Sequence, residues 1–190
     1  SLCIAYCFVK LLIHISRFVT WQTQIKTMVE EAFLNYRRGI EFNVPAIIEE
    51  MRRTYEEDEL GGKSYVSISA EVLGSKLKDF DRQVQVHHWN AVLPHLHAAA
   101  SKIEVRELNG SSADALNYFD HKKGLSVIAV GGDKLSRGLT LEGLSVSYYL
   151  RASKMYDTLM QMGRWFGYRP GYVDLCRLFI SEQLNEWFCH

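Results

Sequence analysis

A run of apolar, partly β-branched residues near the start of the chain constrains the fold more than any other feature. Residues 11–16 read LLIHIS, a pattern typical of a central parallel strand that is buried on both faces. Comparable runs lie at residues 125–130 and 146–150, and further strand patterns cover residues 102–108 and 173–180. Helical patterns separate these strands. Because strands that alternate with helices build a parallel sheet, the sequence predicts an α/β fold.

Helical periodicity is clearest in residues 20–37, where Trp21, Ile25 and Met28 recur at spacings of three and four. Further helices are expected at residues 111–121 and 153–162, each directly after a predicted strand. We therefore expect helices on both faces of the parallel sheet.

The middle third of the chain has a different pattern. Its periodicity is mostly helical, and it interrupts the alternation of strands and helices. We therefore expect a single domain over residues 1–190 that carries a helical insertion at residues 41–100. The elements expected within it are a helix that starts near Asn43 and Pro45, a strand at residues 65–68, and a helix at residues 84–100 that bends near Pro94.

Composition excludes several classes of protein. The 190 residues are 47% hydrophobic, which argues against a disordered chain, and the 22 basic residues balance the 22 acidic ones. A freestanding DNA-binding domain usually has a basic excess, so contact with nucleic acid is expected only as part of a larger assembly. The four cysteines form no CxxC pair, which favours reduced thiols in a cytoplasmic protein, and the N-terminal apolar run is too short to span a membrane. The chain lacks an initiator Met and stops abruptly, so we expect a fragment of a longer protein.

The loop after the strand at residues 125–130 combines glycines with charged residues. Residues 131–144 read GGDKLSRGLTLEGL. Ligands of open α/β sheets bind at the carboxyl ends of the strands, where this loop lies. Glycines allow close approach to a phosphate and expose N–H groups that can cradle it. Arg137 fits such a site, or else it is a surface residue in a strand-to-helix turn.

A second segment places two arginines among glycines and aromatic residues. Residues 160–172 read MQMGRWFGYRPGY, with Arg164 and Arg169 five residues apart. The guanidinium group stays charged and presents a planar fork of donors that suits phosphate. The same arginines could instead pair with carboxylates or stack on Trp165 and Tyr168.

Taken together, these segments resemble helicase motifs. SRGLTLEGL resembles motif V of superfamily-two helicases, QMGRWFGYR resembles motif VI, and LLIHISRFVTWQ fits motif IV, a strand followed by a helix. Their order resembles the second, C-terminal RecA-like lobe of these P-loop NTPases. More narrowly, GGDKLSRGLTLEGL with LMQMGRWFGYR resembles the Z1 domain family, which carries an endonuclease label and is linked to helicase-type ATPases in bacterial DNA-processing and defence proteins.

The resemblance implies roles for particular residues. Arg164 would be the catalytic arginine finger at the γ-phosphate, with Arg169 as the alternative because the gap between the two is five residues instead of the usual three. The residues implied to contact the nucleotide are Asp133, Arg137, Gly138, Gln161 and Gly163. The residues implied to contact nucleic acid are Ser16, Arg17, Lys134 and Thr140.

The chain lacks two parts that such a motor needs. It has no GxxxxGK[ST] phosphate-binding loop and no acidic magnesium motif after a strand. ATP and Mg²⁺ would therefore be held mainly by a first, N-terminal RecA-like lobe outside this chain. The expected partners are that lobe and DNA or RNA, and the chain alone would be an inactive half of an ATP hydrolase.

Two other functions stay open at this stage. The first is an endonuclease or nuclease-associated domain, although the acidic run at residues 56–59 is typical of a solvated helix end and no metal site is expected. His87, His88, His95 and His97 have no regular metal-ligand spacing, which favours structural or surface roles. The second is an inactive RecA-like scaffold that binds partners, which the neutral net charge favours.

Overall fold

The computed structural model describes most of the chain. The described residues are 10–15, 19–59, 62–108, 126–132, 144–149, 166–167, 170–182 and 185–186. The helices expected at residues 111–121 and 153–162 lie outside them. The chain divides into a first unit of residues 1–30, 103–167 and 176–190 and a second unit of residues 31–102 and 168–175.

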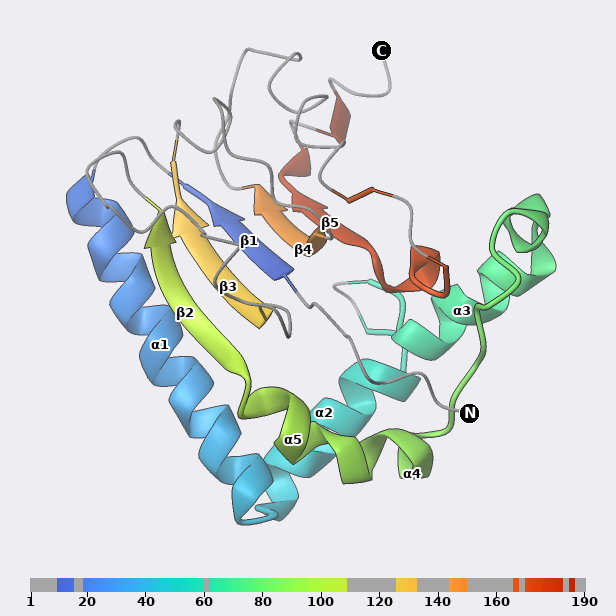
Figure 1. The fold of residues 1–190 in the computed structure, drawn as a ribbon, viewed down its shortest axis with the longest axis horizontal. Coiled ribbons are helices and arrows are strands. Elements are labelled where there is room, and N and C mark those ends of the chain that lie inside the picture. The colour runs from blue at the N-terminus through green and yellow to red at the C-terminus, as the bar shows by residue number, and fades with distance from the viewer. Residues whose placement is uncertain are drawn as a thin grey trace. The chain divides into compact units, whose positions relative to one another are not determined.

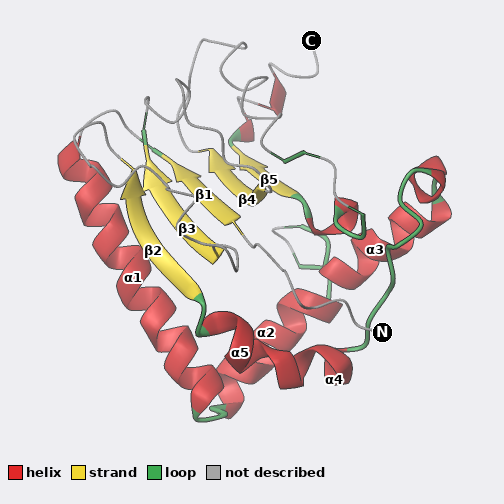
Figure 2. Cartoon of the chain, viewed as in Figure 1, coloured by secondary structure: helices red, strands yellow, loops and turns green. Residues whose placement is uncertain are grey.

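The first unit contains a five-stranded parallel sheet (Figure 1). Its strand order is β2-β3-β1-β4-β5. The strands are β1 (Lys10–His14), β2 (Ile103–Leu108), β3 (Ser126–Gly131), β4 (Leu144–Tyr149) and β5 (Arg177–Ile180). Figure 2 shows these strands in yellow. The predicted α/β fold with a parallel sheet is confirmed, and the arrangement is consistent with a RecA-like fold.

Burial explains why β1 occupies the centre of the sheet. Leu12 in β1 and Val130 in β3 have no exposed surface, and Val127 and Leu144 on the neighbouring strands are 1% exposed. A strand paired on both sides needs apolar residues on both faces, and the run that begins at Leu11 supplies them. Burying each such side chain contributes roughly 1.5–3 kcal/mol to folding.

The final strand is shorter than the sequence predicts. Residues 173–180 were expected to form one strand, but Val173–Leu175 form a 3₁₀-helix, η6, and β5 begins only at Arg177. The side chain of Asp174 in η6 accepts a hydrogen bond from the Ser69 hydroxyl at 2.5 Å. This contact lies 105 residues apart in sequence, so no local pattern could reveal it.

Helix α1 (Val19–Glu41) follows β1 and runs from the first unit into the second. Within the first unit, the Thr23 hydroxyl donates a hydrogen bond to Glu107 Oε2 in β2 at 3.0 Å. The helix buries Gln22, which is 3% exposed, and leaves Trp21 and Met28 about 60% exposed. The apolar spacing therefore predicted the helix correctly, but not which of its residues are buried.

A tight turn closes α1 before helix α2 (Pro45–Glu56) begins. The Val44 amide donates to the carbonyl of Gly39 at 2.8 Å and the Asn43 amide donates to that of Ile40 at 3.2 Å, which is the Schellman pattern of a helix C-terminus. Asn43 has a φ of 51°, a conformation that asparagine tolerates better than most residues. Asn43 thus ends α1, and Pro45 alone marks the start of α2.

The second unit consists of helices. After α2 come α3 (Tyr65–Gly74), the 3₁₀-helix η2 (Lys76–Asp79), α4 (Trp89–Val92), the 3₁₀-helix η3 (Leu93–His95) and α5 (Leu96–Ala100). Three aromatic rings join α2, α3 and α4: the Tyr55 ring packs against the Tyr65 ring at a centroid distance of 6.2 Å and against the Trp89 ring at 5.9 Å. Val72 and Val84 are also buried within this unit.

Two expectations in this region are wrong. Residues 65–68 begin helix α3 instead of forming a strand, because Ser64 caps the helix and accepts a hydrogen bond from the Ser67 amide at 3.1 Å. The helix expected at residues 84–100 begins only at Trp89 and is broken into α4, η3 and α5 around Pro94. The residues before Trp89 are held outside a helix, as the Tyr55 hydroxyl donates to the His87 carbonyl at 3.0 Å. None of the described helices is long and apolar enough to cross a membrane.

The packing of Gly39 yields a test of this fold. A Cβ atom at Gly39 would lie 2.9 Å from Ile47 Cγ2 and 3.0 Å from Ile47 Cβ, and no side-chain rotation can move the Ile47 Cβ atom away. Although alanine normally stabilises a helix, Gly39→Ala should lower the free energy of unfolding by about 1–3 kcal/mol. Gly74→Ala in α3 is the matched control, because a Cβ there meets nothing within 4 Å. Urea denaturation measures both, and a stabilising Gly39→Ala would contradict the packing of α1 on α2.

Candidate functional site

The carboxyl ends of the strands form a row across the sheet. The pairing register places Leu108, Gly131, His14, Tyr149 and Ile180 opposite one another along this row. The strand order reverses around β1 (Figure 1). After β1 the chain forms β2 and β3 on one side of it, and it then crosses to the other side to form β4 and β5. Ligands of open α/β sheets bind outside the carboxyl ends at such a reversal. The end of β1 is therefore the part of the sheet where a ligand site is expected.

A stacked pair of rings occupies the centre of this row. The His14 imidazole at the end of β1 lies 4.7 Å from the Tyr149 ring at the end of β4, with 11° between their planes. Both residues are only 1% exposed. Sequence reasoning did not single out either residue, and the available signal was a histidine inside an otherwise apolar strand. The stack gives the expected ligand edge a rigid, buried support.

The end of β3 has no side chains beside this stack. Gly131 and Gly132 are buried, and the Gly131 carbonyl accepts a hydrogen bond from the Ile15 amide at 3.0 Å. This bond extends the pairing of β1 with β3 one residue beyond β1. The chain therefore leaves β1 and β3 from directly neighbouring points.

All residues of the site predicted from the sequence lie outside the described residues. They are Ser16, Arg17, Asp133, Lys134, Arg137, Gly138, Thr140, Gln161, Gly163, Arg164 and Arg169. The structure describes instead the ends from which their segments continue. Ser16 follows Ile15, Asp133 follows Gly132, and the segment with Arg164 lies between β4 and β5. That these side chains meet at one site stays a prediction.

The helical unit holds the chain just after Arg169. The Asp81 carboxylate accepts hydrogen bonds from the Gly171 amide at 2.7 and 2.8 Å and from the Tyr172 amide at 3.2 Å. Asp81 is 1% exposed. Sequence reasoning missed this residue, because its partners lie 90 and 91 positions away. An aspartate outside a helix is a common turn residue and gives no signal of such a contact.

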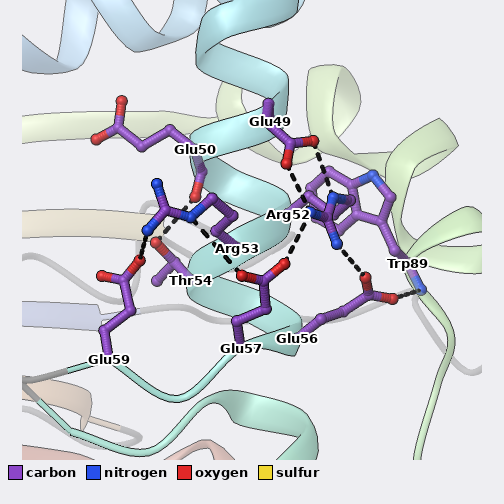
Figure 3. Close-up of polar contacts among 9 residues, drawn as sticks. All are labelled: Glu49, Glu50, Arg52, Arg53, Thr54, Glu56, Glu57, Glu59 and Trp89. Carbon is purple, nitrogen blue, oxygen red and sulfur yellow. Dashed lines mark hydrogen bonds and ion pairs between the residues drawn. The ribbon is translucent and has the colours of Figure 1, made fainter.

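The acidic run at the end of α2 is engaged with arginines (Figure 3). Arg52 binds Glu49 with two hydrogen bonds of 2.6 and 2.9 Å and also bonds to Glu56 and Glu57. The hydrogen bonds from Arg52 lower the pKa of the Glu49 carboxyl. Glu56 additionally accepts from the Trp89 amide at 3.3 Å, which ties α2 to α4. These exposed ion pairs contribute little to stability, because water and salt screen them.

The described residues offer no metal centre. No group of three or more His, Cys, Asp or Glu side chains among them could hold a metal ion. The carboxylates of Glu56, Glu57 and Glu59 instead contact Arg52 and Arg53.

A parallel sheet with a reversal at its central strand, flanked by helices, defines an α/β protein consistent with the RecA-like class. The sequence profile of the Z1 domain family matches residues 6–190. The chain belongs to the Z1 domain family. No curated protein and no solved structure gives a significant match to it.

The His14–Tyr149 stack yields a second test. Tyr149→Ala should lower the free energy of unfolding by about 3–5 kcal/mol, as expected for loss of a buried aromatic side chain. Tyr149→Phe keeps the ring and should retain most of that stability. Urea denaturation of the two variants measures the difference. An equal loss in both would show that the stacked ring is not what stabilises this edge.

Proposed function

We propose that the chain is the second motor lobe of an ATP-dependent superfamily-two DNA helicase or translocase. The observation that supports this most is the order of the central strands, β3-β1-β4. The segment that resembles motif IV contains most of β1, the segment that resembles motif V begins at the end of β3, and the segment that resembles motif VI, residues 161–169, lies in the chain between β4 and β5. The three strands that precede these segments or belong to them are neighbours in the sheet.

The end of the sheet has chemistry that fits a nucleotide phosphate. Gly131 and Gly132 leave the end of β3 without side chains, and glycine permits close approach of backbone N–H groups to a phosphate. Asp133 follows this pair directly, and Arg137 and Gly138 come later in the same segment. Gln161 and Gly163 belong to the second nucleotide-contacting segment in the proposal. When bound, ATP with Mg²⁺, held mainly by the other lobe, supplies the phosphoryl transfer that drives movement.

The arginines carry the proposed catalytic role. Arg164, or else Arg169, would place its guanidinium against the charge that develops on the γ-phosphate, an interaction that accelerates transfer by about 10³–10⁵ in enzymes that use it. Ser16, Arg17, Lys134 and Thr140 would contact the nucleic-acid backbone. Closure of the two lobes would link these two sets of contacts.

Replacing the arginines tests this proposal. In the full-length protein, Arg164→Ala should lower kcat for ATP hydrolysis by about 10³-fold or more, with little change in nucleotide binding. Arg169→Ala should do so if that residue is the finger. Arg106→Ala is the matched control, since Arg106 in β2 pairs with Glu104 on the same strand. Phosphate release and fluorescent-nucleotide binding measure the two effects.

Two results would overturn the motor proposal. One is a full-length gene that encodes no GxxxxGK[ST] loop upstream of this chain. The other is unchanged ATP turnover in both Arg164→Ala and Arg169→Ala. A protein with no ATPase activity at full length would favour a partner-binding scaffold.

The second candidate is an endonuclease or nuclease-associated domain, which the label of the Z1 family favours. The described residues include no group of His, Cys, Asp or Glu that could hold a metal ion, so metal-binding cleavage residues would have to lie elsewhere in the chain. The test is cutting of supercoiled plasmid by this chain with Mg²⁺. Cutting that survives purification to constant specific activity would support it, and intact plasmid would count against it.

A further inference from the structure

A loop in the helical unit presents an exposed aromatic ring among cations. Residues 75–83 read SKLKDFDRQ and come directly after α3 (Figure 1). Phe80 is 75% exposed, although phenylalanine is among the residues that folding buries most often. Lys76, Lys78 and Arg82 on either side of Phe80 are exposed as well. Residues 75–83, called here the basic-aromatic loop, belong wholly to the second unit.

Hydrogen bonds hold the backbone of the basic-aromatic loop. At its start, the Ser75 hydroxyl accepts from the Leu77 amide at 3.1 Å. At its centre, the Asp81 amide donates to the Leu77 carbonyl at 3.0 Å, and the buried Asp81 carboxylate accepts from the Gly171 amide at 2.7 Å. The loop is thus anchored from within, while the residues on both sides of Asp81 stay exposed. A surface that is already ordered loses little conformational freedom when it binds a ligand.

The cations of the loop are not engaged by neighbouring carboxylates. Within the part of the chain that the structure describes, none of these three cations forms an ion pair, whereas Arg52 and Lys63 of the same unit do. Asp79 is the one exposed acidic residue of the loop, because Asp81 is buried. The chain as a whole has no net charge, so the loop concentrates positive charge locally. This charge is available to an anionic ligand.

An exposed ring beside unpaired cations fits the chemistry of a single nucleic-acid strand. Unpaired bases stack on aromatic faces, and cations beside the ring bind the backbone phosphates. Leu77 is 46% exposed, and its spacing of three residues from Phe80 brings both to the same side of a 3₁₀ turn. Leu77 therefore extends the apolar surface available to a base. A duplex offers the same phosphates but no free base face, so the ring favours a single strand.

We propose that the basic-aromatic loop binds single-stranded DNA, with an unpaired base stacked on Phe80 and backbone phosphates bound by Lys76, Lys78 and Arg82. The choice of DNA as the nucleic acid rests on the proposed function. The stacking and the phosphate contacts do not involve ATP, so they can be measured without it. The helical unit then contributes to DNA binding through its own residues.

The experiment measures binding of fluorescein-labelled oligothymidylate to the full-length protein by fluorescence anisotropy, without nucleotide. Phe80→Ala should raise Kd about 10-fold or more, as for loss of base stacking on an aromatic ring. Phe80→Tyr keeps the ring and should retain most of the affinity. Phe42→Ala is the matched control, because Phe42 is 73% exposed in the same unit but follows Glu41 instead of a cation. Because Phe80 is mostly exposed, its replacement removes little buried surface.

Salt dependence tests the phosphate contacts separately from the stacking. Each phosphate contact on a single strand adds about 0.7 to the slope of log Kd against log salt concentration. Lys78→Ala should lower the slope by about this amount. Lys102→Ala is the matched control, since Lys102 is an exposed lysine of the same unit outside the loop, and it should leave the slope unchanged.

Three results would overturn the inference. The first is a rise in Kd for Phe80→Ala no larger than that for Phe42→Ala, which is also the result expected if the loop binds a protein. The second is an equal loss of affinity for a labelled duplex, because stacking on an unpaired base cannot explain it. The third is an unchanged salt slope in Lys78→Ala. None of these results bears on ATP turnover, so the motor proposal stands or fails separately on Arg164→Ala and Arg169→Ala.

Discussion

The pairing of β1 with a parallel neighbour on each side is the constraint on which the rest of the sheet depends. The register aligns His14 with Gly131 on one side and with Tyr149 on the other. Because parallel strands bring their carboxyl ends to one edge, the continuations of β1, β3 and β4 all start there. The apolar residues of β1 make this position possible, since a polar strand could not be buried between two others. The sheet thereby determines where a ligand can bind before any catalytic side chain is considered.

The helical unit depends on a different kind of interaction. Its link to residues 170–175 consists of buried polar contacts, in which Asp81 and Ser69 each bind a partner far away in sequence. Buried polar groups are costly when they lose their partners, so such contacts define one arrangement more strictly than apolar packing does.

The sequence predicted the strands well and the long-range contacts poorly. The apolar runs near Leu11 and Val127 identify strands because burial on both faces requires them. The prediction of a strand at residues 65–68 was wrong, because the Ser64 hydroxyl caps a helix there and outweighs the strand preference of the residues that follow. The row through His14 and Tyr149 depends on strand order, which no local pattern contains. The positions of Arg137, Arg164 and Arg169 remain predictions from motif resemblance.

A structure of the full-length protein with a non-hydrolysable ATP analogue tests the central claim most directly. The account predicts that Arg137 and at least one of Arg164 and Arg169 lie on the same edge of the sheet, beyond His14 and Gly131, and face the phosphates. An Arg137 on the opposite side of the sheet from both Arg164 and Arg169 would contradict it. So would an analogue bound at the amino ends of the strands, beside Lys10.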